Sequence, residues 1–207
     1  MLYIFDELNI IDDVISDSML SLLSKERCEK AGKLLIPSKK KASIAVYLLL
    51  RLALLENYGI DEAVSFIYSD KGKPLLRDYP NIHFNLSHSD NVVVCAVSDF
   101  EIGVDVQNIR PVSDAVARRV LTGEEYTAFK ASPIPDEYFC GIWTVKESFL
   151  KQSGQGITVE LRDISADEIK TKWVFRGKDY FCCVCGYGFV KKRKMIGRKE
   201  IEKLYNR

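Results

Sequence analysis

The stretch over residues 136–152 constrains this chain most, because its helical spacing brings three unlike side chains onto one face. On a period of 3.6 residues, Trp143, Glu147 and Lys151 stand at i, i+4 and i+8. The sequence therefore predicts a helix that carries an aromatic ring, a carboxylate and an amine one above the other.

A second stretch, residues 102–107, alternates apolar and polar side chains as a half-buried strand does. This period places Asp105 and Gln107 on the same face of the strand. Oxygen atoms from the strand, opposite a carboxylate and a lysine from the helix, are the groups that would hold a divalent cation and a phosphate. The spacing leaves a second interpretation open, in which Asp105 and Lys151 form a buried ion pair and Glu147 lies on the surface.

Overall composition indicates a globular protein. With 207 residues, 47% of them hydrophobic, the chain can bury the core of one large domain or of two small halves. Its 30 basic and 29 acidic residues give a net charge of +1, so we expect neither a nucleic acid nor a membrane as partner. The apolar run over residues 44–55 contains Arg51 and is too short to span a bilayer, and the N-terminus does not resemble a signal peptide. We therefore expect a cytoplasmic protein.

The six cysteines include a Cys-Cys-x-Cys run at residues 182–185, with no second pair at zinc spacing. Because small apolar thiols suit a buried strand, we expect reduced cysteines in the core.

In the N-terminal half, the sequence pattern predicts a strand over residues 2–8 and a helix over 12–23. It then predicts a pair of helices over 24–36 and 38–58, in which Pro37 ends the first helix of the pair and Ser38 caps the second. Basic residues crowd the connection of this pair. Solvated helix faces explain most such runs, and a phosphate site is the sharper alternative. The basic residues are Lys25, Arg27, Lys30, Lys33, Lys39, Lys40 and Lys41.

Two polar segments follow among strands expected at 65–69, 82–86 and 92–97. The turn at residues 70–74 presents Lys73 at its tip. The cluster over residues 85–90 contains Ser87 and His88, which could bond a phosphate. The cluster could equally be a turn whose Ser and Asp side chains bond their own backbone.

The C-terminal half predicts a helix over 123–131 with Glu125 in its first turn, where an acid suits the helix dipole or a cap. Its other expected elements are a helix over 111–120 and strands near 161–164, 172–175 and 179–186. This order predicts an α+β fold of two similar halves, with residues 1–100 in the first and 101–207 in the second. The chain contains no phosphate-binding glycine loop and no hydrolase elbow.

Four motifs in this order resemble those of 4′-phosphopantetheinyl transferases of the surfactin-synthetase-activating type, over roughly residues 24–156. They are Gly72-Lys73-Pro74, Phe84-Asn85-Leu86-Ser87-His88-Ser89, Gly103-Val104-Asp105-Val106-Gln107 and Trp143-Thr144-Val145-Lys146-Glu147-Ser148-Phe149-Leu150-Lys151. The resemblance implies the pseudo-dimeric fold of that family, and we expect a monomer. It also implies transfer of the phosphopantetheine arm of coenzyme A to a serine of an acyl or peptidyl carrier protein, releasing 3′,5′-ADP. The carrier would belong to fatty-acid, polyketide or nonribosomal peptide synthesis.

Site residues follow from the same resemblance. Asp105 and Glu147 would hold Mg²⁺, and Glu147 would also be the first candidate for the general base, with Glu125 second by position. Contacts to coenzyme A phosphates would come from Lys151, His88, Lys73, Ser87 and Lys30.

This chain departs from the family at two positions. Gln107 stands where the family usually has a glutamate, so one metal ligand loses its charge. Ala42 stands where an arginine often meets the 3′-phosphate, and we expect the neighbouring Lys41 to supply that charge. Two other functions stay open on the residues alone: a non-catalytic module that binds coenzyme A or the carrier, and another Mg²⁺-dependent enzyme acting on a phosphoanhydride.

Overall fold

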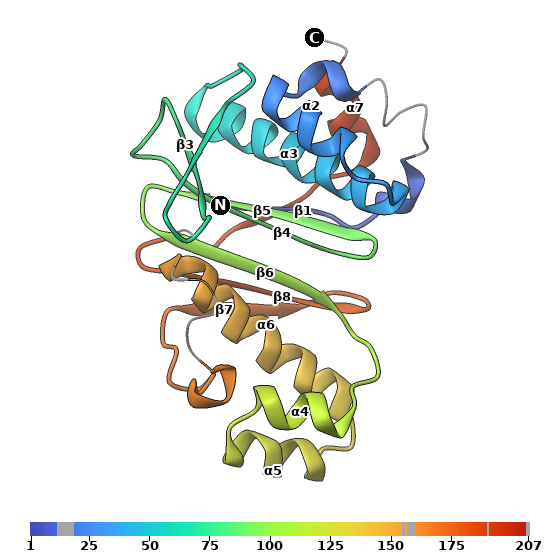
Figure 1. The fold of residues 1–207 in the computed structure, drawn as a ribbon, viewed down its shortest axis with the longest axis vertical. Helices are drawn as coiled ribbons and strands as arrows, with labels where there is room; N and C mark the ends of the chain where they lie inside the picture. Colours follow the sequence, from blue (N-terminus) through green and yellow to red (C-terminus); the bar gives the residue numbers. More distant parts are fainter. Residues whose placement is uncertain (12–18, 155, 157–159, 190, 206–207) are drawn as a thin grey trace.

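The computed structural model describes residues 1–11, 19–154, 156, 160–189 and 191–205. Figure 1 shows four layers, in which a helical layer covers one sheet, a second sheet lies against the first, and a second helical layer closes the other side. The elements are β1 (Leu2–Phe5), η1 (Leu8–Ile10), η2 (Met19–Leu22), α2 (Lys25–Gly32), α3 (Pro37–Tyr58), β2 (Phe66–Tyr68), β3 (Pro74–Leu76), β4 (His83–Ser89), β5 (Val92–Ser98), β6 (Ile102–Asn108), α4 (Asp114–Val120), α5 (Gly123–Ala131), α6 (Pro135–Ser153), η3 (Leu161–Asp163), β7 (Lys172–Arg176), β8 (Tyr180–Gly186), β9 (Arg193–Met195) and α7 (Arg198–Tyr205).

The first sheet has the strand order β4-β5-β1-β9, and α3 packs on its outer face. Residues 42–50 and 52–54 of α3 are all buried, because the helix lies between this sheet and α2 and α7. Pro37 is the first residue of α3, where its missing N–H costs nothing, so it begins the helix. The expectations that the preceding helix runs to Ile36 and that Ser38 caps α3 are therefore wrong.

The second sheet is antiparallel with the order β6-β8-β7, and α6 covers its outer face. Val104 and Val106 of β6 point the other way, into a shared core with Ile4 of β1 and Val94 of β5. Face-to-face packing of the two sheets thus buries the apolar face of β6 and turns its polar face toward α6. This arrangement confirms the α+β class with two halves.

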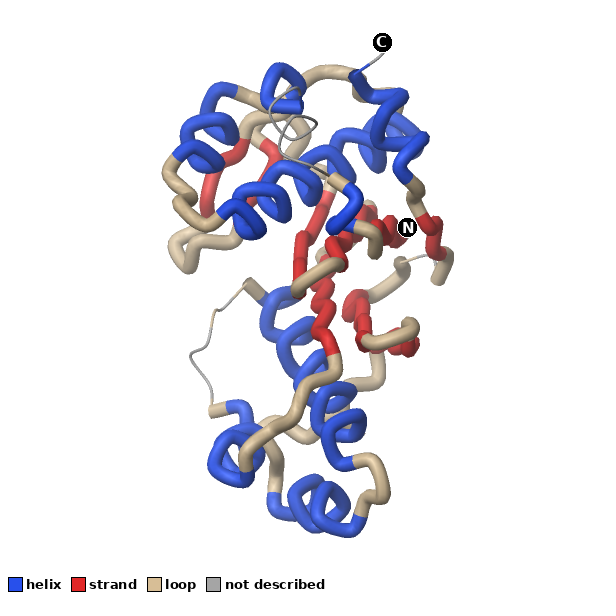
Figure 2. Tube along the Cα trace, turned by 90° about the vertical axis from the view of Figure 1, so that its right-hand side faces the viewer, coloured by secondary structure: helices blue, strands red, loops and turns tan. Residues whose placement is uncertain are grey.

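The end of the chain returns to the first half. β9 pairs in parallel with β1, and α7 packs on α3. The tail, which the expected division at residue 100 assigns to the second half, therefore completes the first sheet and its helical layer. In the side view of Figure 2, the N-terminus lies beside the strands near the middle of the molecule, between the two groups of helices.

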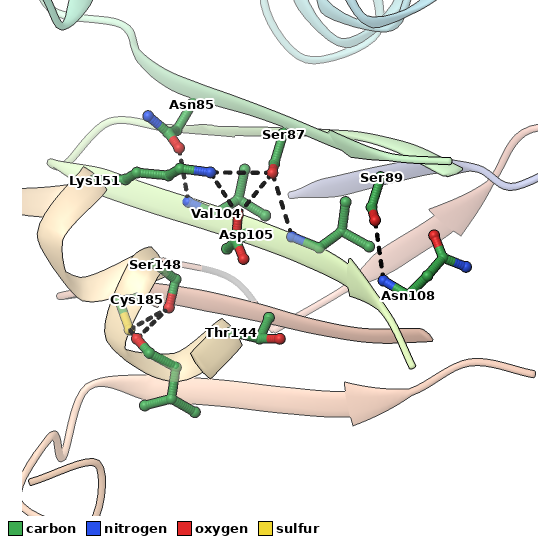
Figure 3. A network of polar contacts seen from close by, with 12 residues as sticks. Asn85, Ser87, Ser89, Val104, Asp105, Asn108, Thr144, Ser148, Lys151 and Cys185 are labelled. Carbon is green, nitrogen blue, oxygen red and sulfur yellow. Dashed lines mark hydrogen bonds and ion pairs between the residues drawn. The ribbon is translucent and has the colours of Figure 1, made fainter. Parts of the chain in front are cut away.

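The two halves also meet along the edges of β4 and β6, through side chains (Figure 3). Alternate residues of β4 accept hydrogen bonds from alternate backbone N–H groups of β6, so no backbone ladder forms between these two strands. The cluster over residues 85–90, for which a turn was one of two interpretations, is thus mostly strand. Within it only Asp90, with φ +41°, takes a turn conformation. The bonds are Val104 N to Asn85 Oδ1 at 2.9 Å, Val106 N to Ser87 Oγ at 3.4 Å and Asn108 N to Ser89 Oγ at 3.1 Å.

Most other expected elements are present, with local differences. The stretch expected as a strand near residue 161 is a 3₁₀ turn, and of the helix expected over 12–23 only residues 19–22 are both described and helical, also as 3₁₀. Residues 12–18 lie outside the described part. All six cysteines are free thiols, and five of them are buried. Within the described residues, no helix is both long and apolar enough to cross a bilayer.

Gly103 allows α6 to approach β6 closely, and its replacement tests that packing. A Cβ at this position would lie 2.0 Å from the backbone oxygen of Ser148. We predict that Gly103→Ala lowers the free energy of unfolding by roughly 3 kcal/mol, measured by urea denaturation, because helix and strand must separate. Gly123→Ala is the control, since nothing lies within 4 Å of its added Cβ. Equal stability of both variants would contradict this packing.

Candidate active site

Asp105 is the centre of the polar face of β6 and is only 5% exposed. Its Oδ1 accepts hydrogen bonds from Lys151 Nζ at 2.5 Å and from Ser87 Oγ at 2.8 Å (Figure 3). Its Oδ2 is also buried and has no hydrogen-bond partner in the described part of the chain. A buried carboxylate oxygen without a partner is costly, so this atom is suited to receive a further cation.

Glu147 lies one turn before Lys151 on α6 and is half-buried. Desolvation raises the pKa of Glu147, the negative charge of Asp105 raises it further, and Lys151 opposes both. The interpretation of a buried Asp105–Lys151 pair with a surface glutamate is thus right about the pair and wrong about the glutamate. The charge of Lys151 thus acts on both carboxylates, those of Asp105 and Glu147.

The carboxylates of Asp105 and Glu147 fit a hard divalent cation, because such ions bind carboxylate oxygens. A single lysine also leaves the two negative charges only partly neutralised. Within the described residues, no three His, Cys, Asp or Glu side chains come together as a metal site. Gln107, the third expected ligand, follows Asp105 on the same face of β6. It lines a separate cavity of about 240 Å³, together with Cys140 and Trp143.

The hydroxyl of Ser87 is hydrogen-bonded within the protein. It donates to Asp105, and it accepts from Lys151 Nζ at 3.0 Å and from Val106 N at 3.4 Å. A hydroxyl has one proton and two lone pairs, so all of its bonding capacity is used within the protein. Ser87 therefore orients Asp105 and Lys151.

Two adjoining cavities open beside this cluster and share Gly72, Pro74 and Leu86 in their walls. Together they form a cleft to which both halves contribute. The first, of about 270 Å³, is also lined by Lys71, Lys73, Asn85, Glu147, Leu150, Lys151, Gly154 and Gly156. The second, of about 330 Å³, is also lined by Arg27, Lys30, Leu34, Lys39, Ser43, Val46, Phe66, Tyr68 and His88.

Arg27 lines the second cavity, although the sequence pattern indicated it only as one member of a basic run. It is 5% exposed and donates to the backbone oxygen of Ser43 at 2.8 Å and to its Oγ at 3.0 Å. Its guanidinium lies over the rings of Tyr47 and Phe66, and its Nε has no partner in the described residues. The sequence feature that could have indicated a buried Arg27 is its position four residues before Ala31, on the buried face of α2.

The second cavity also gathers Lys30, Lys39 and His88. Desolvation lowers the pKa of His88, the charges of Lys151 and Lys39 lower it further, and Asp105 opposes them, so the neutral imidazole is favoured. Lys41 does not line the cavity, and Ala42 is buried in the core. Lys39, which shares its helix face with Ser43 four residues later, is the lysine of this segment that lines the cavity.

Lys73 is held by the protein, contrary to the expectation that the turn presents it freely. Its Nζ donates to the backbone oxygen of Gln152 at 2.6 Å and to that of Ile102 at 3.5 Å. Its stem still lines the first cavity.

Glu125 lines none of these cavities and is bonded on both carboxylate oxygens, at the N-terminus of α5. Oε2 accepts from Lys146 Nζ at 2.5 Å and from Thr122 N at 2.8 Å, and Oε1 accepts from Ala166 N at 2.8 Å. Lys146 is fully buried and also donates to two backbone carbonyls. Because these bonds use the Glu125 carboxylate to close the helix cap, we assign it a structural role in place of the expected catalytic one.

The two glutamates should therefore differ in stability measurements. We predict that Glu125→Ala lowers the free energy of unfolding by about 3–5 kcal/mol, because it leaves the Lys146 ammonium buried without its counter-charge. Glu147→Gln should raise the unfolding midpoint in metal-free buffer, because it removes one of two mutually repelling carboxylates. Chemical denaturation of both variants beside the unmodified protein tests this, and destabilisation of both to the same extent would refute the distinction.

Comparison with known proteins matches two successive parts of this chain to family models. Residues 101–188 match the model of the 4′-phosphopantetheinyl transferase superfamily. Residues 15–100 match the model of the 4′-phosphopantetheinyl transferase N-terminal region.

Individual relatives carry the same name. A 4′-phosphopantetheinyl transferase of Bacillus subtilis is 35% identical over 153 residues, which cover 72% of this chain and 68% of the relative. The transferase Sfp of Bacillus subtilis strain 168 is 31% identical over the same shares. The transferase HetI of a Nostoc species is 34% identical over 67% of this chain and 62% of the relative. Three of the four motifs line one cleft, and Asp105 of the remaining motif bonds Lys151 beside it. With both of its halves matched, this chain belongs to the 4′-phosphopantetheinyl transferase family, in its Sfp-like branch.

Proposed function

We propose that this protein transfers the 4′-phosphopantetheine arm of coenzyme A to a serine hydroxyl of an acyl or peptidyl carrier protein and releases 3′,5′-ADP. The observation that carries the proposal is the cluster of Asp105, Glu147 and Lys151 at one end of a cleft whose other end is basic. A donor with a pyrophosphate and a further phosphate needs positive charge near each of these two groups. Carboxylates that hold a metal ion are needed only beside the pyrophosphate. The names of the relatives support the same reaction.

The cleft suggests how the donor lies. Arg27, Lys30 and Lys39 suit the phosphate at the nucleotide end, because they surround the second cavity. Neutral His88 can add a hydrogen bond there. Lys151 suits the pyrophosphate, because its amine stands beside Asp105 in the first cavity.

For the metal, we propose Mg²⁺ bound by Asp105 and Glu147, with the Gln107 amide as an uncharged third oxygen ligand from the same face of β6. Oδ2 of Asp105, which has no hydrogen-bond partner in the part of the chain that the structure describes, supports Asp105 as a ligand. When bound, the ion would neutralise the pyrophosphate and the charge that develops on the leaving phosphate.

The side chains supply proton transfer and orientation. Glu147 accepts the proton of the carrier serine, directly or through one water. The serine oxygen then bonds to the phosphorus that bears the pantetheine arm. The bond from that phosphorus to the bridging oxygen breaks, and Lys151 stabilises the departing 3′,5′-ADP. Ser87 keeps the Lys151 amine at this position.

One assay separates the open alternatives. The protein is incubated with coenzyme A, Mg²⁺ and an apo carrier protein, and the carrier is weighed by mass spectrometry. A mass increase equal to the pantetheine arm on the carrier serine supports the transferase. Bound but unchanged coenzyme A would indicate a binding module, and cleaved coenzyme A with an unmodified carrier would indicate a different phosphoanhydride enzyme.

The carboxylates at the site should be essential for transfer. We predict that Asp105→Asn and Glu147→Gln each reduce the transfer rate by about 10²-fold or more, because they remove charge at nearly constant volume. Glu124→Gln, an exposed carboxylate on α5, is the matched control and should keep the unmodified rate. Near-normal turnover of either site variant at saturating Mg²⁺ would disprove the assignment.

Gln107 provides a test of the metal site without relying on turnover. Gln107→Glu restores a charge at nearly the same size, so we predict tighter Mg²⁺ binding in the absence of coenzyme A and weaker coupling between the two ligands. Calorimetric titration of Mg²⁺ into both proteins, with and without coenzyme A, measures this. Unchanged metal affinity in the variant would show that the side chain at position 107 does not face the ion and only lines the separate cavity beside Cys140 and Trp143.

A further inference from the structure

The hairpin of β2 and β3 forms one wall of the cleft and is a sheet of only two strands. An isolated pair of strands is marginally stable in water, so its position depends on its attachments. Phe66 at its base stacks on Phe84, with ring centroids 5.2 Å apart. At its tip, Gly72 and Pro74 line both cavities, and Lys73 between them reaches the other half of the protein.

The amine of Lys73 joins three elements at one point. It donates to the backbone oxygen of Gln152, in the last turn of α6, at 2.6 Å. It also lies 3.5 Å from the backbone oxygen of Ile102, the first residue of β6. The last carbonyls of a helix lack intrahelical partners and carry partial negative charge, so an ammonium group is well placed there.

Gly154 allows this contact. It ends α6 with φ +64°, and a Cβ built on it would lie 2.9 Å from Cδ of Lys73. The stem of Lys73 therefore lies directly over the glycine that ends the helix. Removal from water lowers the pKa of Lys73, consistent with an amine placed between backbone groups.

Both carbonyls are close in sequence to the charged groups of the site. Gln152 follows Lys151, and Ile102 precedes Asp105 by three residues on the same strand. By bonding these two carbonyls, the Lys73 amine also sets the distance between the β2–β3 hairpin and the Asp105–Lys151 pair.

We propose that Lys73 is a positioning residue, which fixes the hairpin wall of the cleft against the strand and the helix that carry Asp105 and Lys151, and that it does not bind a donor phosphate directly. A phosphate contact would require the amine to leave the Gln152 carbonyl and release the tip of the hairpin. The kinetic consequence rests on the proposed function, whereas the contact itself does not.

Hydrogen exchange of the ligand-free protein tests the contact. Lys73→Met keeps an unbranched stem over Gly154 and removes the amine. We expect amide exchange in residues 66–76 and 150–154 to accelerate by about tenfold or more, with little change in β8. Lys73→Arg should restore slow exchange because it donates to the same carbonyls. Lys71→Met, an exposed lysine of the same turn, should exchange like the unmodified protein. Should the Met variant not fold, Lys73→Gln is measured in its place.

Kinetics then separates positioning from direct binding. Positioning predicts that Lys73→Met lowers kcat and raises KM for coenzyme A together, and that Lys73→Arg restores both. Unchanged exchange in the free Met variant, with only KM raised, would overturn the proposal in favour of a direct phosphate contact. If the unmodified protein failed to modify a carrier, the proposed function would fail, and the exchange experiment would still decide whether Lys73 holds the hairpin.

Discussion

The edge of β6 that has no neighbouring strand in its own sheet is the constraint on which the rest of the structure depends. Its N–H groups face β4 across the junction of the halves, and each buried N–H left unpaired would cost about 1–3 kcal/mol. Asn85, Ser87 and Ser89 remove that cost with side-chain oxygens instead of a backbone ladder. Because the oxygen of Ser87 also bonds Asp105 and Lys151, one atom serves both the assembly of the halves and the site. A change at this junction would therefore affect both.

Two ion pairs on α6 show how a structural charge differs from a functional one. Lys146 directs its amine to three oxygens, and its partner Glu125 is bonded at both carboxylate oxygens, so the pair is closed. Asp105 keeps one buried oxygen without a partner in the described residues, and Glu147 stands nearby with a raised pKa. The second arrangement costs stability until a cation or an anionic donor completes it. Incomplete satisfaction, more than burial, thus distinguishes the site.

Local patterns predicted much of the chemistry. The helical spacing of residues 136–152 became α6 with one residue added at each end, and the alternating strand became β6. The polar cluster at residues 85–90 was misjudged for a physical reason. Alternating Asn and Ser side chains are typical of turns that bond their own backbone, yet here they bond the backbone of a strand about 19 residues later. Nothing within the segment distinguishes the two outcomes.

The sequence by itself determined which groups the protein can use, because spacing along a helix or strand is a local property: Glu147 and Lys151 on one helix face, Asp105 on one strand face, and the family motifs around them. Tertiary structure decided what each group does. It placed Lys39 in the cavity in place of Lys41, closed Glu125 into a helix cap, and turned Lys73 from the solvent to the end of α6. The role of a polar side chain depends on the partners that satisfy it, and those partners come from segments far away in the chain.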